Sequence, residues 1–250
     1  MPQVLKLGSR GTEVTRLQNA LNTALRPSPN LTPDGAFGPR TRAAVMQLQR
    51  NNWLVVDGEA GACTQACAFG TEAYPPILHN IPLIAQPTGT TCWATSTAMM
   101  INSTVPAVIA NTPAEMIASD GGLRNWSETD QALPRGQAYG RIHGLRCNAP
   151  QSYMVSAMVA MLRRGPLMWD MLWDTVGYLT PDAAFPGEYM GSSGHMIVVI
   201  GVRGDGNPDG SGTTLRVNDP WPPNVGATYS VGYAKWMREV PTRTYRVFER

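Results

Sequence analysis

The sequence has little charge and few cysteines, and each shortage excludes a class of protein. Only 15% of the 250 residues are charged and the formal net charge is +2, which argues against a dedicated binder of nucleic acids or acidic membranes. Four cysteines do not make a disulfide scaffold in a chain of this length, and Cys63 and Cys67 have no nearby histidine pair with which to bind zinc. We therefore expect an ordinary globular protein of one or two domains.

Two kinds of hydrophobic segment are also missing. No window of about eighteen apolar residues exists, so we expect no segment to span a membrane. The first residues, MPQVLKLGSRG, lack a basic region followed by an apolar region, so no secretory signal is recognisable. We expect the protein to be secreted or delivered outside the cytoplasm without a recognisable signal peptide, and to be cytoplasmic before export.

A loop of glycine and threonine followed by an apolar run sets one cysteine at the start of a predicted helix. The run from Cys92 to Ile101 contains no proline, glycine or charge, which predicts a helix buried on most sides, with Thr90 or Thr91 as its N-cap. The first turn of a helix has unpaired N–H groups and the positive end of the helix dipole, which favour a thiolate over a thiol. A thiolate attacks carbonyl groups, so Cys92 is a candidate nucleophile.

The sequence offers a candidate for each group that such a nucleophile needs. Gln86 lies six residues before Cys92, where its side-chain amide could stabilise an oxyanion together with the Cys92 backbone N–H. His195 opens the apolar run HMIVVIGV, a predicted strand, and is the candidate base. Asp219 follows on the next predicted strand and could orient His195. Asn218 competes for that position, and because the two residues alternate along the strand, only one of them can point at His195.

This constellation resembles the papain-like cysteine peptidases of clan CA. Among them it is most similar to compact bacterial branches, the papain-fold effector proteases of plant pathogens and the bacteriocin-leader peptidases. The resemblance implies that Cys92 is the nucleophile, His195 the base, Asp219 the orienting group and Gln86 the oxyanion donor, and that no cofactor is needed. It is carried by these residues: Gln86, Cys92, Trp93, Gly194, His195, Asp219, Pro220 and Trp221.

A repeated pattern near the N-terminus predicts a second, smaller domain. The pattern D-G-x-x-G-x-x-T begins at Asp34 and again 23 residues later at Asp57. In each copy we expect Asp-Gly to form a tight turn, the second glycine to adopt an unusual backbone conformation and the threonine to cap a helix. Apolar residues recur at helical spacing beside these turns, which predicts a small bundle of three helices; they are Val14, Leu17 and Leu21, then Ala44, Val45 and Leu48.

The three segments LKLGSRGTEVTRLQNAL, DGAFGPRTRAAVMQLQ and LVVDGEAGACT resemble, in order, the peptidoglycan-binding type 1 domain. The resemblance implies attachment to bacterial peptidoglycan. Such a bundle can also serve as a pro-segment or as a docking module for a partner, and this alternative stays open.

Together these patterns predict an α+β protein. Residues 1–72 are expected to form the small three-helix bundle, residues 73–85 an extended linker rich in proline, and residues 86–250 a papain-like domain in which a buried N-terminal helix packs on an antiparallel sheet. The strands are expected in the runs PLMWDMLW, HMIVVIGVRG, TLRVNDP, TYSVGYAKW and TYRVFER, and a short helix in TPAEMIASDGG, with Thr112 and Glu115 as a capping box.

Two long polar segments are expected to border the substrate cleft. Residues 121–150 are interpreted as a loop that forms one wall, with His143 as a surface residue. Residues 174–194 lead directly into His195 and are expected to overhang the site as a movable lid.

The resemblance implies hydrolysis of amide bonds through an acyl-thioester on Cys92 and leaves the substrate open. In one hypothesis a protein or peptide is cleaved by an enzyme that its N-terminal domain targets to the bacterial cell wall. In a second, a secreted antibacterial effector cleaves the stem peptide of peptidoglycan, with a secretion system and an immunity or inhibitor protein as partners. In a third, the protein binds the wall without catalysis. No hypothesis includes nucleic acid or a membrane as a partner.

Overall fold

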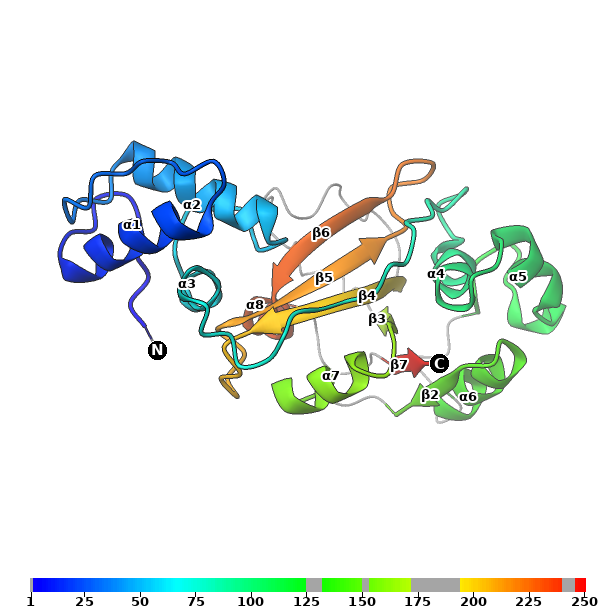
Figure 1. Ribbon diagram of the computed structural model, residues 1–250. Coiled ribbons are helices and arrows are strands. Elements are labelled where there is room, and N and C mark those ends of the chain that lie inside the picture. The colour runs from blue at the N-terminus through cyan, green and yellow to red at the C-terminus, as the bar shows by residue number, and fades with distance from the viewer. Residues whose placement is uncertain (1, 125–131, 150–152, 172–193, 240–245) are drawn as a thin grey trace.

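The computed structural model describes residues 2–124, 132–149, 153–171, 194–239 and 246–250. Three N-terminal helices form one body, and a second body of strands and helices lies beside them (Figure 1). Within these ranges, no helix combines the length and the apolar character needed to cross a lipid bilayer. The expected α+β class, with a helical N-terminal domain before a domain built on an antiparallel sheet, is confirmed.

The N-terminal helices are α1 (Thr12–Ala24), α2 (Pro39–Asn51) and α3 (Ala62–Phe69). Proline at the first position of α2 suits a helix start, where its missing N–H costs nothing. The apolar faces of the helices meet in one core, whose fully buried members include Val14, Leu17, Leu21 and Val45. The bundle is therefore stabilised chiefly by the burial of these aliphatic side chains.

A buried glutamine lies inside the first copy of the repeated pattern. Gln18 donates its Nε2 to Asp34 Oδ1 at 2.9 Å and to Thr41 Oγ1 at 3.2 Å. Its Oε1 accepts from the backbone N of Gly35, 3.1 Å away, which has a φ of +72°. The aspartate, the glycine and the threonine of the pattern thus converge on a single amide.

The second copy repeats this arrangement around Gln49. It donates to Asp57 Oδ1 at 2.8 Å and Thr64 Oγ1 at 3.2 Å, and accepts from Gly58 N at 3.0 Å. The prediction that the threonines cap helices is wrong: glycines occupy both N-cap positions, and each threonine hydroxyl accepts from the glutamine instead. The repeat therefore builds two turns, and each turn satisfies the hydrogen bonds of its own buried glutamine side chain.

The second body is built on an antiparallel sheet with the order β2-β7-β3-β4-β5-β6, to which β1 adds beside β4. All ten residues of β4 are buried, so the strand forms the centre of the fold. The strands are β1 (Ile77–Leu78), β2 (Arg146–Asn148), β3 (Leu167–Met171), β4 (His195–Gly204), β5 (Thr213–Asp219), β6 (Ala227–Gly232) and β7 (Arg246–Glu249).

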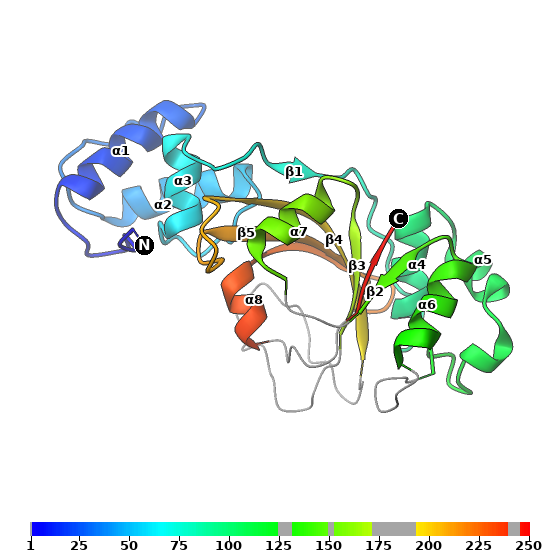
Figure 2. The ribbon, with the colours of Figure 1, turned by 90° about the horizontal axis from the view of Figure 1, so that it is seen from below.

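Helices cover both faces of this sheet (Figure 2). On one face α4 (Cys92–Ile101), α5 (Val105–Asn111) and α6 (Ala132–Ile142) pack on alternate residues of β4 such as Met196 and Val198. On the other face α7 (Val155–Leu162) and α8 (Tyr233–Glu239) pack on the intervening residues, such as Ile197 and Val199. Because neighbouring residues of a strand face opposite sides, the continuous apolar run of β4 contributes side chains to two hydrophobic cores, one on each face of the sheet.

The region 121–150 differs from the expected loop. Its described residues include α6 and β2, and Gly140 lies so close to the following chain that a Cβ there would meet Leu145 O at 2.5 Å. Gly136 and Gly140 are thus positions of close packing inside α6, which the sequence alone does not distinguish from loop glycines. The prediction of a strand through YAKW is also wrong beyond Gly232, because α8 begins at Tyr233.

His143 is buried, with 6% of its surface exposed, so its placement at the surface is wrong. Its Nε2 lies 3.0 Å from Thr112 Oγ1, its ring packs 4.6 Å from the ring of Tyr139, and burial lowers its pKa. Thr112 closes α5 by donating to Val108 O at 2.8 Å, so it does not form the expected capping box. Residues 114–116 form only a single 3-10 turn.

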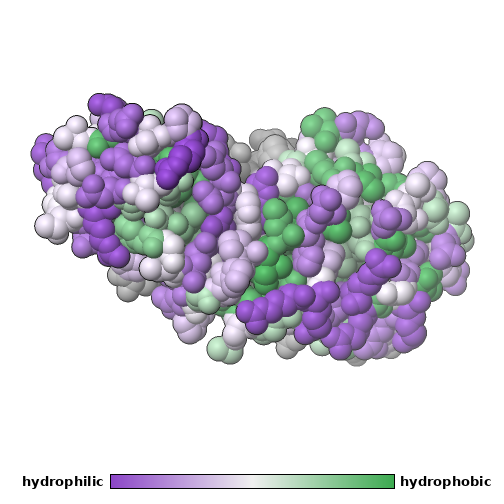
Figure 3. Space-filling view, in the orientation of Figure 1, coloured by the Kyte–Doolittle hydropathy of each residue, from purple (hydrophilic) through white to green (hydrophobic). Residues whose placement is uncertain are grey.

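The segment between the two bodies runs along the sheet. Ile77 and Leu78 pair with Val202 and Gly201 of β4, and Ala73 N donates to Gly204 O at 3.0 Å. Figure 3 shows hydrophobic surface across the middle of this face, over the connecting segment and the sheet, while the N-terminal helices present a mostly hydrophilic surface. The chain is thus held to the sheet along this segment.

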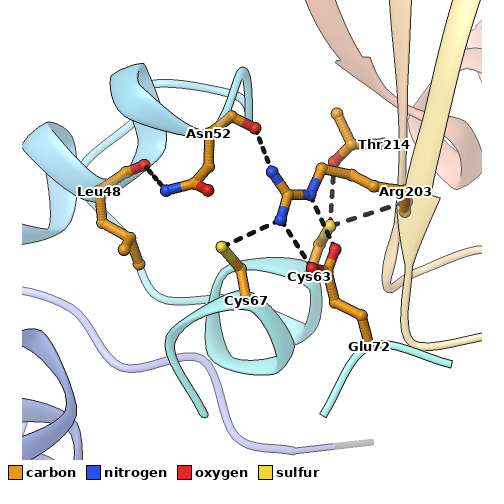
Figure 4. Close-up of polar contacts among 7 residues, drawn as sticks. All are labelled: Leu48, Asn52, Cys63, Cys67, Glu72, Arg203 and Thr214. Carbon is orange, nitrogen blue, oxygen red and sulfur yellow. Dashed lines mark hydrogen bonds and ion pairs between the residues drawn. The ribbon is translucent and has the colours of Figure 1, made fainter. Parts of the chain in front are cut away.

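Arg203 of β4 is the main polar contact between the two bodies (Figure 4). The guanidinium donates from Nε and Nη2 to the two carboxylate oxygens of Glu72, each at 2.7 Å, and from Nη1 to Asn52 O at 2.5 Å. Nη2 also lies 3.2 Å from Cys67 Sγ, and the guanidinium is 5.1 Å from the ring centroid of Trp53. Only 4% of this side chain is exposed.

Further contacts extend the junction across β5 and β6. Thr214 Oγ1 donates to Cys63 Sγ at 3.3 Å, and Ser230 Oγ donates to Trp53 O at 2.5 Å. All four cysteines are free. The N-terminal bundle is therefore docked at the end of the sheet where β4 finishes, opposite the end where His195 begins that strand.

Candidate active site

Hydrogen bonds of the residues just before Cys92 fix the start of α4. Thr91 is the N-cap, but its hydroxyl accepts from Thr88 N at 3.2 Å and makes no capping bond to the helix. Thr90 Oγ1 donates to Asp120 O at 2.8 Å. Cys92 itself, the first residue of the helix, is partly exposed, as a nucleophile that must meet a substrate has to be.

His195 and Asp219 meet because β4 and β5 are antiparallel neighbours. His195 begins β4 and Asp219 ends β5, so the two residues lie at the same end of the sheet. His195 Nε2 is 2.8 Å from Asp219 Oδ1, and the side chains are only 3% and 1% exposed. In this buried setting the carboxylate fixes both the orientation and the protonation of the imidazole.

The charge of His195 is set by competing effects. Burial disfavours the imidazolium, but the Asp219 carboxylate and a side-chain hydrogen bond with Cys92 outweigh it and raise the pKa of His195 above its ordinary value. The imidazole thus interacts with the thiol and the carboxylate together. A raised pKa favours the protonated form of His195, beside the Cys92 side chain.

Asn218 points elsewhere. Its Nδ2 donates to Ile81 O at 2.8 Å and its Oδ1 accepts from Thr228 Oγ1 at 2.7 Å, so its amide is used in packing the connecting segment against β6. Asp219 Oδ1, by contrast, also accepts from Trp221 N at 2.9 Å. Of the two competitors, Asp219 is the residue that contacts His195.

Gln86 is fully buried in the loop before α4. Its backbone N donates to Pro220 O at 3.0 Å, and its backbone O accepts from Asn224 N at 2.8 Å, which ties the loop to the residues that follow Asp219. The side-chain Nε2 donates to Thr88 O at 2.6 Å. Its Oε1 is buried without a hydrogen bond, and the second Nε2 proton is not used by this bond.

The other cysteines differ from Cys92 in their surroundings. Burial raises the pKa of Cys63 to about 12 and that of Cys147 to about 11, and it also raises the pKa of Cys67. At these three positions the raised pKa favours the protonated thiol, which is the less nucleophilic form. Among the described residues, no three His, Cys, Asp or Glu side chains are grouped as metal ligands would be.

Other parts of the site were not expected from the sequence. Trp93 Nε1 donates to Gly121 O at 3.1 Å and so supports the loop beside Cys92. Tyr229 contacts Asp219 from β6, and only its position in an alternating strand gave a signal for it. The expected lid at residues 174–194 lies outside the described residues, except for Gly194.

Comparison with known families finds one match in each of the two bodies of the fold. Residues 76–235 match the family described as papain-like cysteine protease AvrRpt2, and residues 10–67 match a peptidoglycan binding domain. The first match includes Cys92, His195 and Asp219, and the second spans the three N-terminal helices up to Cys67.

Three solved structures are similar to parts of the chain. A fused Zn-dependent amidase/peptidase/peptidoglycan-binding domain-containing protein from Clostridium acetobutylicum is 35% identical over 27% of this chain, with a TM-score of 0.25, and the match spans only 29% of that protein. The SleB N-terminal domain is 33% identical over 28% of this chain and 93% of its own length, with a TM-score of 0.26. A protein described as a C39-like peptidase from Bacillus anthracis is 13% identical over 71% of this chain and 98% of its own, with a TM-score of 0.40.

Proposed function

Because the chain belongs to the papain-like cysteine protease family of AvrRpt2, we propose that it hydrolyses amide bonds with Cys92 as nucleophile, His195 as base and Asp219 as the group that orients the base. The observation that carries this proposal is the buried imidazole of His195, which engages Asp219 and Cys92 together. Since Nε2 faces Asp219, proton exchange with the thiol is assigned to Nδ1.

In the proposed reaction, the Cys92 sulfur attacks the carbonyl carbon of an amide and forms a C–S bond. His195 then gives its proton to the amine nitrogen, the C–N bond breaks and an acyl-thioester remains. Water attacks this ester while His195 accepts its proton, the C–S bond breaks, and a carboxylate product leaves. The Cys92 backbone N–H and the second Nε2 proton of Gln86 are the proposed donors to the oxyanion formed in both steps.

The N-terminal domain favours a substrate at the bacterial cell wall. Residues 10–67 match a peptidoglycan binding domain, so we propose that this domain holds the enzyme on peptidoglycan while it cleaves a peptide or protein there. A second candidate substrate is the peptidoglycan stem peptide itself. The docking of the domain through Arg203 and Glu72 favours it, because a bound wall polymer would then lie at a fixed place relative to Cys92. In that case the enzyme would be a secreted antibacterial effector.

Purified sacculi incubated with the wild-type protein and with Cys92→Ala should separate these candidates. We expect both proteins to sediment with sacculi, because the N-terminal domain is unchanged. Mass spectrometry that finds fragments of the stem peptide released by the wild-type protein alone would identify a peptidoglycan hydrolase and the bond that it cleaves. No release, with sedimentation intact, would leave a protein at the wall as the substrate, and failure of both proteins to sediment would contradict the targeting role.

The roles of Asp219 and Asn218 can be compared directly. Asp219→Ala is expected to lower kcat by about 10²–10⁴-fold, because the imidazole loses its orienting partner, and His195→Ala should cost more. Asn218→Ala should lower the melting temperature instead and leave kcat nearly unchanged, since its amide bonds Ile81 O. Turnover of a fluorogenic peptide checks both. A larger loss in Asn218→Ala than in Asp219→Ala would reassign the third position.

A further inference from the structure

A tyrosine on β6 reaches the carboxylate of Asp219 from the side away from His195. In the register of β5 and β6, Val217 lies opposite Tyr229 and Asp219 lies opposite Ala227. Tyr229 and Asp219 are therefore diagonal neighbours on one face of the sheet, a spacing that a long side chain can bridge. The Tyr229 hydroxyl donates to Asp219 Oδ2 at 3.1 Å.

The two oxygens of Asp219 accept from different elements. Oδ1 faces His195 Nε2 from β4 and Trp221 N from the segment after β5, at 2.8 and 2.9 Å. Oδ2 faces Tyr229 from β6. The terminal torsion of an aspartate has a broad energy minimum, so its own covalent geometry does not fix the carboxylate plane. Donors on both oxygens fix it, because rotation would lengthen at least two of these bonds.

Tyr229 is itself held firmly. Its side chain is 8% exposed and belongs to a core cluster with Val217, Val231 and Trp236. A phenol in such a core has little freedom to move away from Asp219. Its hydroxyl donates without adding a charge, so the negative charge of Asp219 remains available to His195.

The charged groups around this site come from several strands and one helix. Cys92 on α4 and Asp170 on β3 both interact with His195, and Asp170 is paired with Arg246 of β7, whose Nε lies 2.9 Å from Asp170 Oδ2. The charge of Asp170 is thus already balanced by Arg246. Asp219 is the carboxylate that is hydrogen-bonded to His195, and its orientation decides how well the imidazolium is held.

We propose that Tyr229 is a positioning residue of the active site, which acts through Asp219 to hold His195 in its productive orientation. This inference rests on the proposed function, since it assumes that Cys92 and His195 are the reacting pair. It assigns to β6 a part in catalysis, although no residue of that strand need touch the substrate.

Alkylation of Cys92 by iodoacetamide tests the positioning role of Tyr229 and needs no known substrate. In the wild-type protein we expect iodoacetamide to alkylate Cys92 faster than the other three cysteines at pH 5–7, because His195 is hydrogen-bonded to Cys92 and burial raises the pKa of the others. Tyr229→Phe should slow the reaction of Cys92 near pH 6 by about threefold to tenfold and move the midpoint of its pH profile upward by about half a unit to one unit, the amount expected for one lost hydrogen bond. With a peptide substrate, kcat should fall while KM stays unchanged.

Tyr233→Phe is the matched control. Tyr233 is also buried and donates its hydroxyl to Tyr153 O, away from Asp219, so this variant loses a comparable bond but should keep the wild-type alkylation profile. Site-specific replacement of Tyr229 by 3-fluorotyrosine keeps the ring and makes the hydroxyl a stronger donor, so its effect should have the opposite sign. This second variant decides the question if Tyr229→Phe folds poorly.

A double-mutant cycle separates positioning from general stability. In the background of Asp219→Ala, Tyr229→Phe should change the alkylation rate no further, because the residue through which it acts is gone. An equal loss in both backgrounds, or a Tyr229→Phe profile that matches wild type, would overturn the inference. If Cys92 is not selectively alkylated even in the wild-type protein, the proposed nucleophile is wrong, which is a separate result.

Discussion

Cys92→Ala is expected to abolish turnover while the protein stays folded. The substitution removes the only atom proposed to bond covalently to the substrate, so we expect kcat to fall by about 10³–10⁶-fold. The cost in stability should be small, because Cys92 is partly exposed at the first position of α4 and alanine is a strong helix former. Hydrolysis of a fluorogenic peptide, measured beside a thermal melt, checks both expectations.

Cys67→Ala provides the control for this substitution. Cys67 is also a partly exposed helical cysteine, but it lies in α3 of the N-terminal domain, and we expect its variant to keep full turnover. Residual activity of Cys92→Ala above a thousandth of wild type would refute its role as nucleophile. An equal loss in both variants would point to damage to the fold rather than to the chemistry.

Glu72→Gln is expected to destabilise the junction between the two domains. The substitution keeps the shape of the side chain but leaves the guanidinium of Arg203 buried without its counter-charge. Breaking a buried ion pair by removing one partner costs about 3–5 kcal/mol, and the remaining acceptor at Asn52 O can offset only part of this. We expect a melting temperature lower by several degrees and faster proteolysis of residues 73–76.

An exposed ion pair on α1 gives the matched control for Glu72. Glu13 and Arg16 lie 3.7 Å apart with each side chain 59% exposed, so Glu13→Gln should change stability by less than about 1 kcal/mol. Equal effects of the two variants would show that the buried pair does not hold the domains together. The same junction bears on deletion of residues 1–72, which removes Glu72 as well as the bundle and should therefore lower the stability of the peptidase domain.

The residues of the candidate site were predictable where local patterns carry the signal. Cys92 follows a loop and opens an apolar helix, and His195 opens an apolar strand, so their positions are visible in short windows of sequence. Strand alternation predicts that only one of Asn218 and Asp219 can face His195, and in the structure that residue is Asp219.

The remaining features of the fold and of the candidate site depend on contacts that short windows of sequence do not show. His143 looks like a surface residue until Thr112, 31 residues earlier in the chain, is seen beside its ring. Tyr229 gains its role only through the pairing of β5 with β6. The repeated pattern does not identify Gln18 and Gln49 as its centres, because it contains the residues that bind each amide and not the amide itself.

The docked bundle has a consequence for how the enzyme would search its surroundings. A domain on a flexible tether samples a volume that grows with the length of the linker, so its catalytic partner reaches many bonds from one anchoring point. Here the N-terminal bundle is docked near one end of β4 and Cys92 lies near the other, and ten residues of strand span roughly 30 Å. The strand would thus fix the distance between the two sites, and cleavage would occur at a constant distance from each point of attachment.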